Sequence, residues 1–302
     1  MIDRELFRFS HEVETALAAE RAVVALESTV IAHGLPRPQN LETAERLEEI
    51  VRERGAVPAT IAILDGKLCV GLNKEELRRL AESDAVRKVS RRDLPLAIAR
   101  EWEGATTVAS TSWIAHRAGI RVFATGGIGG VHRGDLPDVS ADLPALAETP
   151  IIVVCSGAKS VLDLAATREW LETYAVTVIG YGCDEMPAFY TRRSGLAIDA
   201  RVDSPAHTAI IADTHRALGT NGALLITVPV PAASEVPFDE LQSALDGALK
   251  DAACAGVTGR ELTPYLLSRM KELSGGATLE SNIALLENNA RVAADIAQAL
   301  RH

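Results

Sequence analysis

Residues 151–172 read IIVVCSGAKSVLDLAATREWLE and indicate the architecture of the whole chain. The first five residues are apolar and mostly β-branched, which is typical of a strand buried on both faces of a sheet. Ser156 and Gly157 then permit a tight turn, and apolar residues beyond Lys159 recur at helical spacing. The segment therefore predicts a central strand, a turn and a helix that begins at Lys159.

Lys159 is a candidate nucleophile because of this placement. Open α/β sheets bind their ligands at the carboxyl ends of the strands, which is where this lysine is expected. Partial desolvation and the positive end of a helix dipole would both disfavour the ammonium form and favour a nucleophilic amine. The alternative is a surface lysine that opens a helix.

Strand and helix patterns alternate along the rest of the chain. ATIAILDGKLCVGL, residues 59–72, predicts a hairpin with its turn at Asp65-Gly66. Repeated alternation predicts a three-layer α/β/α fold with a mixed, mostly parallel central sheet, in a single domain over residues 1–302. Strands are expected at residues 21–26, 86–90, 121–124, 176–182 and 223–228, and helices at residues 43–54, 74–83, 94–102, 113–118, 206–218, 238–255 and 279–300.

The composition excludes several classes of protein. With 47% hydrophobic and 24% charged residues among 302, the chain is expected to be soluble and globular. Its net charge of -10 argues against a nucleic-acid-binding surface, although a few cations in one cleft could still hold a small anionic substrate. We expect no signal peptide and no membrane span. The four cysteines form no CxxC pair, which favours reduced thiols and a cytoplasmic location.

Glu27 directly follows the buried run VVAL at the end of the first expected strand. Burial would raise the pKa of its carboxyl group and suit it to act as a general acid. A salt bridge to an arginine is the alternative.

Residues 125–134, TGGIGGVHRG, follow another strand. The glycines leave backbone amides free to approach a ligand, and His132 and Arg133 could contact a phosphate or hydroxyl group. The spacing fits neither the dinucleotide fingerprint nor the P-loop.

Three further segments carry polar candidates. Residues 138–142, DVSAD, offer two carboxylates to a hard divalent cation, or a helix N-cap at Ser140 or Asp142. Residues 88–95, KVSRRDLP, could hold a phosphate, or form a solvated charged turn. Asn282, in SNIALLENNA, could cap a helix or reach a polar ligand.

Together these segments resemble the pseudouridine-5′-phosphate glycosidase family. The likeness runs from Val24 to Ala290 and is carried by VALESTVIAHGLPRPQN, GAVPATIAILDG, KVSRRDLP, GATTVAST, VFATGGIGGVHRG, DVSADL, GAKSVLDL and SNIALLENNA. The resemblance implies an α/β/α fold, a homotrimer and a divalent manganese requirement. It also implies reversible cleavage of a carbon–carbon glycosidic bond to give uracil and ribose 5-phosphate.

The resemblance also assigns roles to residues. It implies that Glu27 is the proton donor, Lys159 the covalent nucleophile and Asp138 the holder of one Mn²⁺ per subunit. The substrate contacts that it implies are Lys88, Val108, Thr125, His132, Ser140, Ala141, Asp142 and Asn282.

A carbon leaving group explains why a lysine is needed. Uracil cannot leave as a carbanion, whereas a lysine nitrogen on the sugar can expel it and leave an imine. Two alternatives remain. Loosely matched segments at residues 180–190 and 226–236 leave room for a related synthase that joins ribose 5-phosphate to another heterocycle. A non-catalytic sugar-phosphate-binding protein would be expected to lack Glu27, Lys159 or Asp138.

Overall fold

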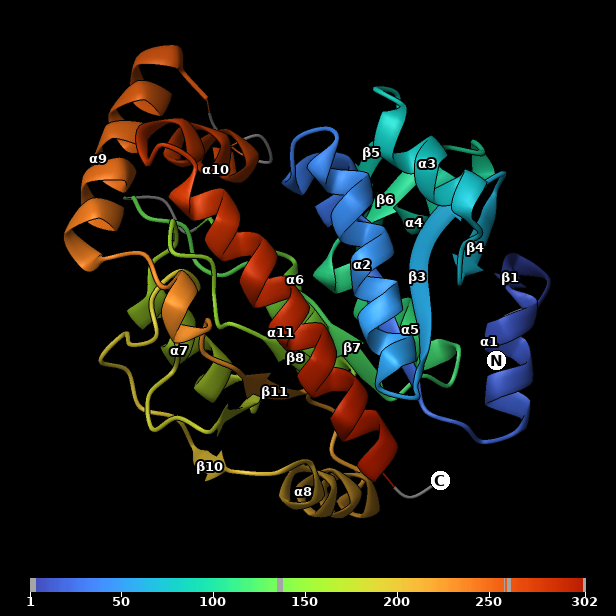
Figure 1. Ribbon diagram of the computed structural model, residues 1–302. Helices are drawn as coiled ribbons and strands as arrows, with labels where there is room; N and C mark the ends of the chain where they lie inside the picture. Colours follow the sequence, from blue (N-terminus) through green and yellow to red (C-terminus); the bar gives the residue numbers. More distant parts are fainter. Residues whose placement is uncertain (1–3, 135–137, 258, 260–261, 301–302) are drawn as a thin grey trace.

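The computed structural model describes residues 4–134, 138–257, 259 and 262–300, which form one mixed sheet between helices (Figure 1). The sheet has eleven strands in the described residues. They are β1 (Phe7–Phe9), β2 (Val23–Glu27), β3 (Val57–Leu64), β4 (Lys67–Val70), β5 (Arg87–Val89), β6 (Gly104–Thr106), β7 (Val122–Ala124), β8 (Ile152–Cys155), β9 (Thr177–Tyr181), β10 (Ala200–Val202) and β11 (Leu224–Thr227).

The strands run in the order β1-β4-β3-β2-β7-β8-β11-β9-β10, with β6 beside β3 and β5 beside β6. Only the β3–β4 and β3–β6 pairs are antiparallel among the described strands. The prediction of a mixed, mostly parallel sheet is confirmed. In the register, Leu26 pairs with Ala124, and Ala124 with Val154, so that β2, β7 and β8 end at one edge.

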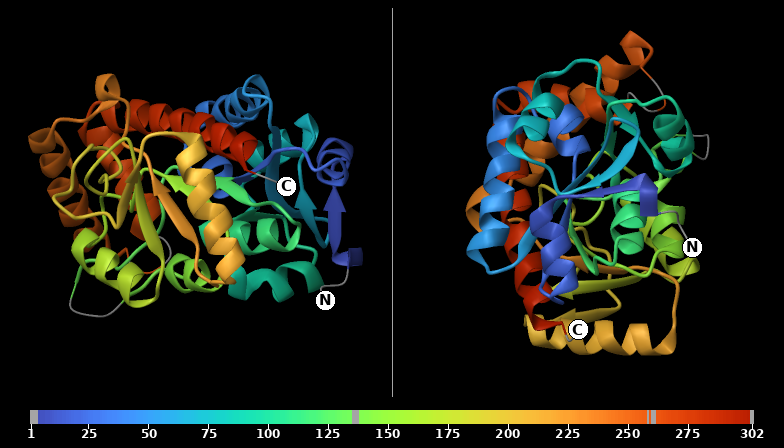
Figure 2. Two further views of the ribbon diagram at one scale, coloured as in Figure 1. Left: turned by 90° about the horizontal axis from the view of Figure 1, so that it is seen from below. Right: turned by 90° about the vertical axis from the view of Figure 1, so that its right-hand side faces the viewer.

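Helices cover both faces of the sheet, which confirms the three layers. Figures 1 and 2 show α2 and α11 on one face and α5, α6 and α7 on the other. The helices are α1 (His11–Ala18), α2 (Gln39–Glu53), α3 (Lys74–Glu82), α4 (Leu94–Ala99), α5 (Val108–Arg117), α6 (Asp142–Glu148), α7 (Leu164–Thr173), α8 (Pro205–Leu218), α9 (Phe238–Ala255), α10 (Leu262–Leu273) and α11 (Ala277–Ala299). None of the described helices is long and apolar enough to cross a membrane.

Burial on both faces explains the unbroken apolar runs in the sequence. All five residues of β2 and all four of β8 are buried. The expected hairpin is also present, since β3 and β4 pair on either side of Asp65 and Gly66, which both have positive φ angles (51° and 70°). These angles suit the tight turns that join hairpin strands.

The prediction that a helix begins at Lys159 is wrong. Helix α7 begins at Leu164, where the Asp163 side chain accepts a hydrogen bond from Ala166 N (2.9 Å) and caps it. Residues before it form a loop, in which Lys159 N donates to Ile128 O (3.1 Å). Val161 and Leu162 are buried in this loop, so their spacing reflects core packing there and not helical periodicity.

Other segments also differ from expectation. No helix is expected between residues 27 and 43, yet residues 30–34 form a wide helical turn, η2 (Val30–Gly34). Helix α10 was not predicted, although it packs against α9, α11 and η2. The division into domains is not tested by these contacts, and a single domain stays a prediction.

Candidate active site

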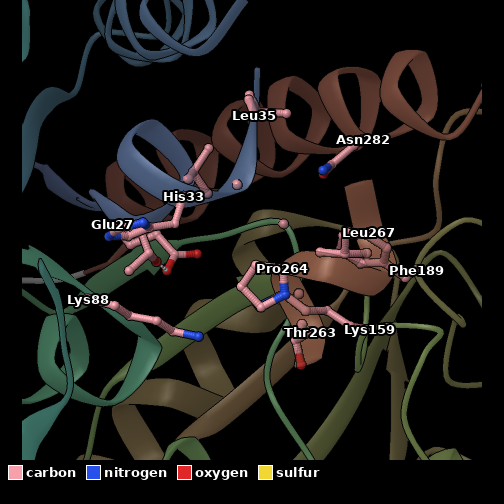
Figure 3. Close-up of a pocket in the computed structure, with 15 residues that line it drawn as sticks. Glu27, His33, Leu35, Lys88, Lys159, Phe189, Thr263, Pro264, Leu267 and Asn282 are labelled. Atoms are coloured by element: carbon pink, nitrogen blue, oxygen red, sulfur yellow. Dashed lines mark hydrogen bonds between the residues drawn. The ribbon is translucent and has the colours of Figure 1, made fainter. Parts of the chain in front are cut away.

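A cavity of about 560 Å³ lies at the carboxyl ends of β2, β7 and β8 (Figure 3). Glu27 is the last residue of β2, Gly126 and Gly127 follow β7, and Lys159 follows β8. Segments from elsewhere in the chain complete the wall: η2, β5, α10, α11 and the loop that contains Phe189. The lining residues that these segments contribute include His33, Leu35, Lys88, Phe189, Thr263, Pro264, Leu267 and Asn282.

Glu27 is buried at the base of the cavity and holds two hydroxyl groups. Thr29 Oγ1 donates to Glu27 Oε2 (2.5 Å), and Thr125 Oγ1 donates to the other carboxyl oxygen. Burial raises the pKa of Glu27, against the lowering effects of the Lys159 charge and of the two hydroxyl groups. The carboxyl group is therefore suited to hold a proton and donate it. The alternative of an arginine salt bridge does not hold, because Thr29 and Thr125 are the hydrogen-bond partners of Glu27 among the described residues.

Lys159 is half-buried and lines the same cavity. Its charge lowers the pKa of Glu27, which means that the two side chains lie near one another. Because α7 begins at Leu164, the helix-dipole argument for activating this amine fails.

Lys88 lies on β5 and reaches the cavity from the side opposite α10. Figure 3 shows its amine and the Glu27 carboxyl group both pointing into the open space. Lys88 and Lys159 thus bring two amines to one small cavity.

Asn282 also lines the cavity, and it does not cap a helix. Helix α11 begins at Ala277 after the cap residue Gly276, so Asn282 lies inside the helix. Capping is therefore excluded, and a contact between Asn282 and a ligand stays a prediction. Thr125, the partner of Glu27, is buried beside the cavity.

Asp142 is buried, and its carboxylate accepts hydrogen bonds from backbone amides, one of them in the glycine loop (residues 125–134). Its carboxylate oxygens accept hydrogen bonds from Ala109 N and Gly129 N, both at 2.9 Å. Asp142 therefore joins the start of α5 to the glycine loop. It is the first residue of α6 and not its cap, which is Ala141 and makes no side-chain cap bond.

Ser140 and Val108 lie beside this junction. Ser140 Oγ accepts a hydrogen bond from Asp142 N (3.3 Å), and Val108 is buried as the first residue of α5. Neither these two residues nor Ala141, Asp142 or His132 is among the described residues that line the cavity. Their substrate contacts stay predictions.

Asp138 is exposed, and its backbone carbonyl accepts a hydrogen bond from His132 N (2.8 Å). In the described part of the chain, no three His, Cys, Asp or Glu side chains gather as a metal cluster would require. A single carboxylate fits a hard divalent cation that keeps most of its water ligands, and does not fit zinc. The donor set is thus compatible with Mn²⁺ held by Asp138 and water.

The loop from Met186 to Tyr190 approaches the site, and its role was missed in the sequence. Phe189 lines the cavity with a φ angle of 66°, which is a strained conformation for a bulky residue. Gly157 accommodates this loop: its φ angle is 83°, and a Cβ there would lie 2.0 Å from Pro187 O. The sequence MPAFY, residues 186–190, gives no sign that this loop approaches Gly157 so closely.

Other wall residues were also missed. Thr29 stands two residues after Glu27 in EST, and its spacing could have suggested a hydroxyl partner. The α10 residues Thr263, Pro264 and Leu267 have no such signal, because only tertiary packing brings α10 to the cavity.

Comparison with known proteins agrees with this geometry. The model of the family described as indigoidine synthase A-like protein matches residues 12–299. Pseudouridine-5′-phosphate glycosidase from Geobacillus kaustophilus is 52% identical over 97% of this chain and 98% of its own length. The protein of the same name from Symbiobacterium thermophilum is 53% identical and covers 98% of both chains.

Solved structures give the same result. The prealnumycin C-glycosynthase AlnA, in complex with ribulose 5-phosphate, has a TM-score of 0.90 and 41% identity, and covers 98% of this chain and 97% of its own. An indigoidine synthase A-like protein from Thermotoga maritima has a TM-score of 0.86 and 38% identity, with 91% and 92% covered. The chain therefore belongs to the indigoidine synthase A-like family, which includes the pseudouridine-5′-phosphate glycosidases.

Proposed function

We propose that this protein is a pseudouridine-5′-phosphate glycosidase that converts its substrate and water, reversibly, to uracil and ribose 5-phosphate. The observation that carries the proposal is the presence of Glu27 and Lys159 in one cavity, with burial holding the proton on Glu27. The relatives that share this name at about half identity over nearly the full chain support the choice of substrate.

The lining of the cavity argues against an ordinary glycosidase mechanism. That mechanism uses two carboxyl groups, one as acid and one as base or nucleophile. Among the described residues that line the cavity, Glu27 is the one carboxyl group. An amine from Lys159 fills the second role instead.

The proposed steps balance protons and electron pairs. Glu27 donates its proton to the ring oxygen of the ribose as the C1′–O4′ bond breaks, and the neutral amine of Lys159 forms a bond to C1′. The secondary ammonium that this addition forms transfers a proton to C5 of uracil, and the nitrogen lone pair that is freed expels the base, leaving an iminium on Lys159. Water adds to the iminium and returns a proton to Glu27, and ribose 5-phosphate leaves as the amine of Lys159 is restored.

Lys88 is proposed to hold the phosphate group of the substrate. Its amine points into the cavity at some distance from Glu27, so that it can pair with a phosphate group while Glu27 stays in place. Thr125 keeps Glu27 in place, and Asn282 offers an amide to the polar edge of the base. The glycine loop, held by Asp142, Ser140 and their neighbours, supplies backbone donors.

We assign Mn²⁺ to Asp138, where it would orient a polar group of the substrate through bound water. Only this residue among the described carboxylates near the glycine loop is exposed and not committed to backbone amides. The homotrimer is likewise proposed on the family resemblance, and light scattering on the purified protein tests it.

A second candidate is a C-nucleoside synthase for a larger heterocycle. The cavity adjoins a second hollow of about 570 Å³, which shares His33, Leu35 and Asn282 with it and extends to Tyr190 and Lys271. AlnA, a C-glycosynthase, has the same fold. This extra space favours a bulkier base than uracil.

One assay decides between the candidates. Uracil release from pseudouridine 5′-phosphate, measured with and without Mn²⁺, is expected to be metal-dependent and fast. Coupling of ribose 5-phosphate to uracil is then compared with coupling to larger heterocycles. A preference for the larger bases, with slow uracil release, would support the synthase and overturn the proposal.

A further inference from the structure

Asn289 is a fully buried amide that contacts two loops of the active site. Its Nδ2 donates to Thr125 O (2.8 Å) and lies 3.1 Å from Ser156 Oγ. A third, longer bond reaches Gly126 O (3.4 Å). Both Asn289 and Ser156 have no exposed surface. A buried amide with three partners in two segments is costly to leave unsatisfied, and so it fixes both segments relative to the helix that carries it.

The two loops carry the groups that perform the chemistry. Thr125 follows β7 and donates its hydroxyl hydrogen bond to Glu27. Ser156 follows β8 and stands three residues before Lys159. Asn289 lies on α11, which packs against β2, β7 and β8. The Asn289 side chain therefore holds both Thr125, the partner of Glu27, and the loop that carries Lys159 to helix α11.

Backbone hydrogen bonds already hold the loops to one another, since Ser156 N donates to Gly126 O (2.8 Å) and Ile128 N to Gly157 O (3.1 Å). These bonds do not reach α11. Loss of the Asn289 amide would leave the loops paired but would free them to shift together relative to α11 and to Glu27 on β2. We therefore expect the substitution to misalign Lys159 and Glu27 without preventing folding.

We propose that Asn289 is a positioning residue for the glycosidase reaction, which holds the paired loops of Thr125 and Lys159 at the spacing from Glu27 that the reaction requires. The inference rests on the proposed function. Near-attack geometry makes this spacing matter, because a misplacement of about 1 Å can cost on the order of 100-fold in rate. Substrate binding depends on other groups, Lys88 above all.

The test compares matched substitutions on one helix. Asn289→Leu keeps the size of the side chain and removes its donors. Asn288→Leu makes the same change at the next position, where the amide makes two long bonds outside the cavity: Nδ2 donates to Pro229 O (3.5 Å) and Oδ1 accepts from Arg291 Nη1 (3.4 Å). Steady-state kcat and KM for uracil release are measured well below the Tm of each variant, with folding checked by circular dichroism.

We expect Asn289→Leu to lower kcat by about 30-fold with KM changed by less than about threefold, and Asn288→Leu to change neither by more than about twofold. A folded Asn289→Leu protein with kcat within about threefold of the unaltered chain would overturn the inference. So would a rise in KM with kcat unchanged, because that would place the amide in substrate binding.

Ser156→Ala decides the matter if Asn289→Leu does not fold. It removes only the bond to the Lys159 loop and is expected to lower kcat about fivefold at nearly unchanged Tm. Unchanged kcat in this variant would then overturn the inference. Failure of the proposed function is a different result: the unaltered chain itself would release no uracil.

Discussion

Glu27 and Lys159 face one cavity from two strands that are not neighbours, because β7 lies between β2 and β8. Of the effects that lower the pKa of Glu27, the charge of Lys159 is the largest, and burial outweighs it. The cavity thus holds a carboxyl group that keeps its proton beside an amine. This combination is what a reaction with a carbon leaving group requires.

The first prediction concerns the acid. Glu27→Gln is expected to lower kcat by at least about 100-fold, because the amide cannot donate a proton to the ring oxygen. Glu48→Gln is the matched control, since Glu48 is also a buried glutamate with a raised pKa, bonded to Thr60 away from the cavity. Steady-state uracil release measures both. Equal losses in the two variants would show that burial of a carboxyl group, and not catalysis, explains the effect.

The second prediction concerns stability and pH. A carboxyl group whose pKa is raised on folding binds its proton more tightly in the native state than in the unfolded state. Its contribution to the free energy of unfolding therefore falls as the pH rises above the pKa of the unfolded state, 4.5. The glutamine variant lacks this penalty. We expect the free energy of unfolding of Glu27→Gln, relative to the unaltered chain, to increase between pH 4.5 and neutrality. Urea titrations at several pH values measure it, and a difference that shrinks with pH would contradict the assignment.

The third prediction concerns the hydroxyl partner of the acid. The hydrogen bond from Thr125 lowers the pKa of Glu27, so Thr125→Val should raise that pKa. Because the reaction needs protonated Glu27, the alkaline limb of the kcat/KM profile is expected to move to higher pH. Thr208→Val, which removes a buried hydroxyl in α8, serves as the control and should leave the profile in place. A limb that moves to lower pH would refute the role of Glu27 as acid.

The fourth prediction separates the two aspartates of residues 138–142. Asp138→Ala should abolish the stimulation of turnover by Mn²⁺ and leave the Tm unchanged, since this side chain is exposed. Asp142→Ala should lower stability by about 1–3 kcal/mol, because two buried backbone N–H groups lose their acceptor. Thermal unfolding and metal titration distinguish them. Full activity of Asp138→Ala in the presence of a chelator would exclude the metal role.

The sequence predicted the active-site residues that follow the central strands better than those that come from α10 and the Phe189 loop. Glu27 and Lys159 follow buried strands, and parallel strands end at one edge, so local pattern was sufficient to place them together. Lys88 and Asn282 were candidates from their own segments, with capping or a charged turn as alternatives, and the family resemblance strengthened them; the cavity contains both. Asp138, Asp142 and Val108 are not among the described residues that line the cavity, since backbone amides occupy the Asp142 carboxylate and Val108 is buried at the start of α5. Their metal or substrate contacts stay predictions.

The remaining cavity wall depends on contacts between segments that are distant in the sequence. Helix α10 and Phe189 reach the cavity through tertiary packing, and the strained backbone of Phe189 opposes its local preference. The start of α7 was misjudged for a related reason: Val161 and Leu162 are buried in the core although the helix begins only at Leu164. Periodicity records burial and cannot tell which element provides it.

The central claim is that the amine of Lys159 bonds to the sugar. Borohydride added during turnover of pseudouridine 5′-phosphate would reduce the iminium to a stable secondary amine, and peptide mass spectrometry would locate it. We predict a reduced ribose 5-phosphate adduct on Lys159, absent from Lys159→Arg and still formed in Lys88→Gln. An adduct on Lys88, or rapid turnover with no adduct at all, would contradict the account.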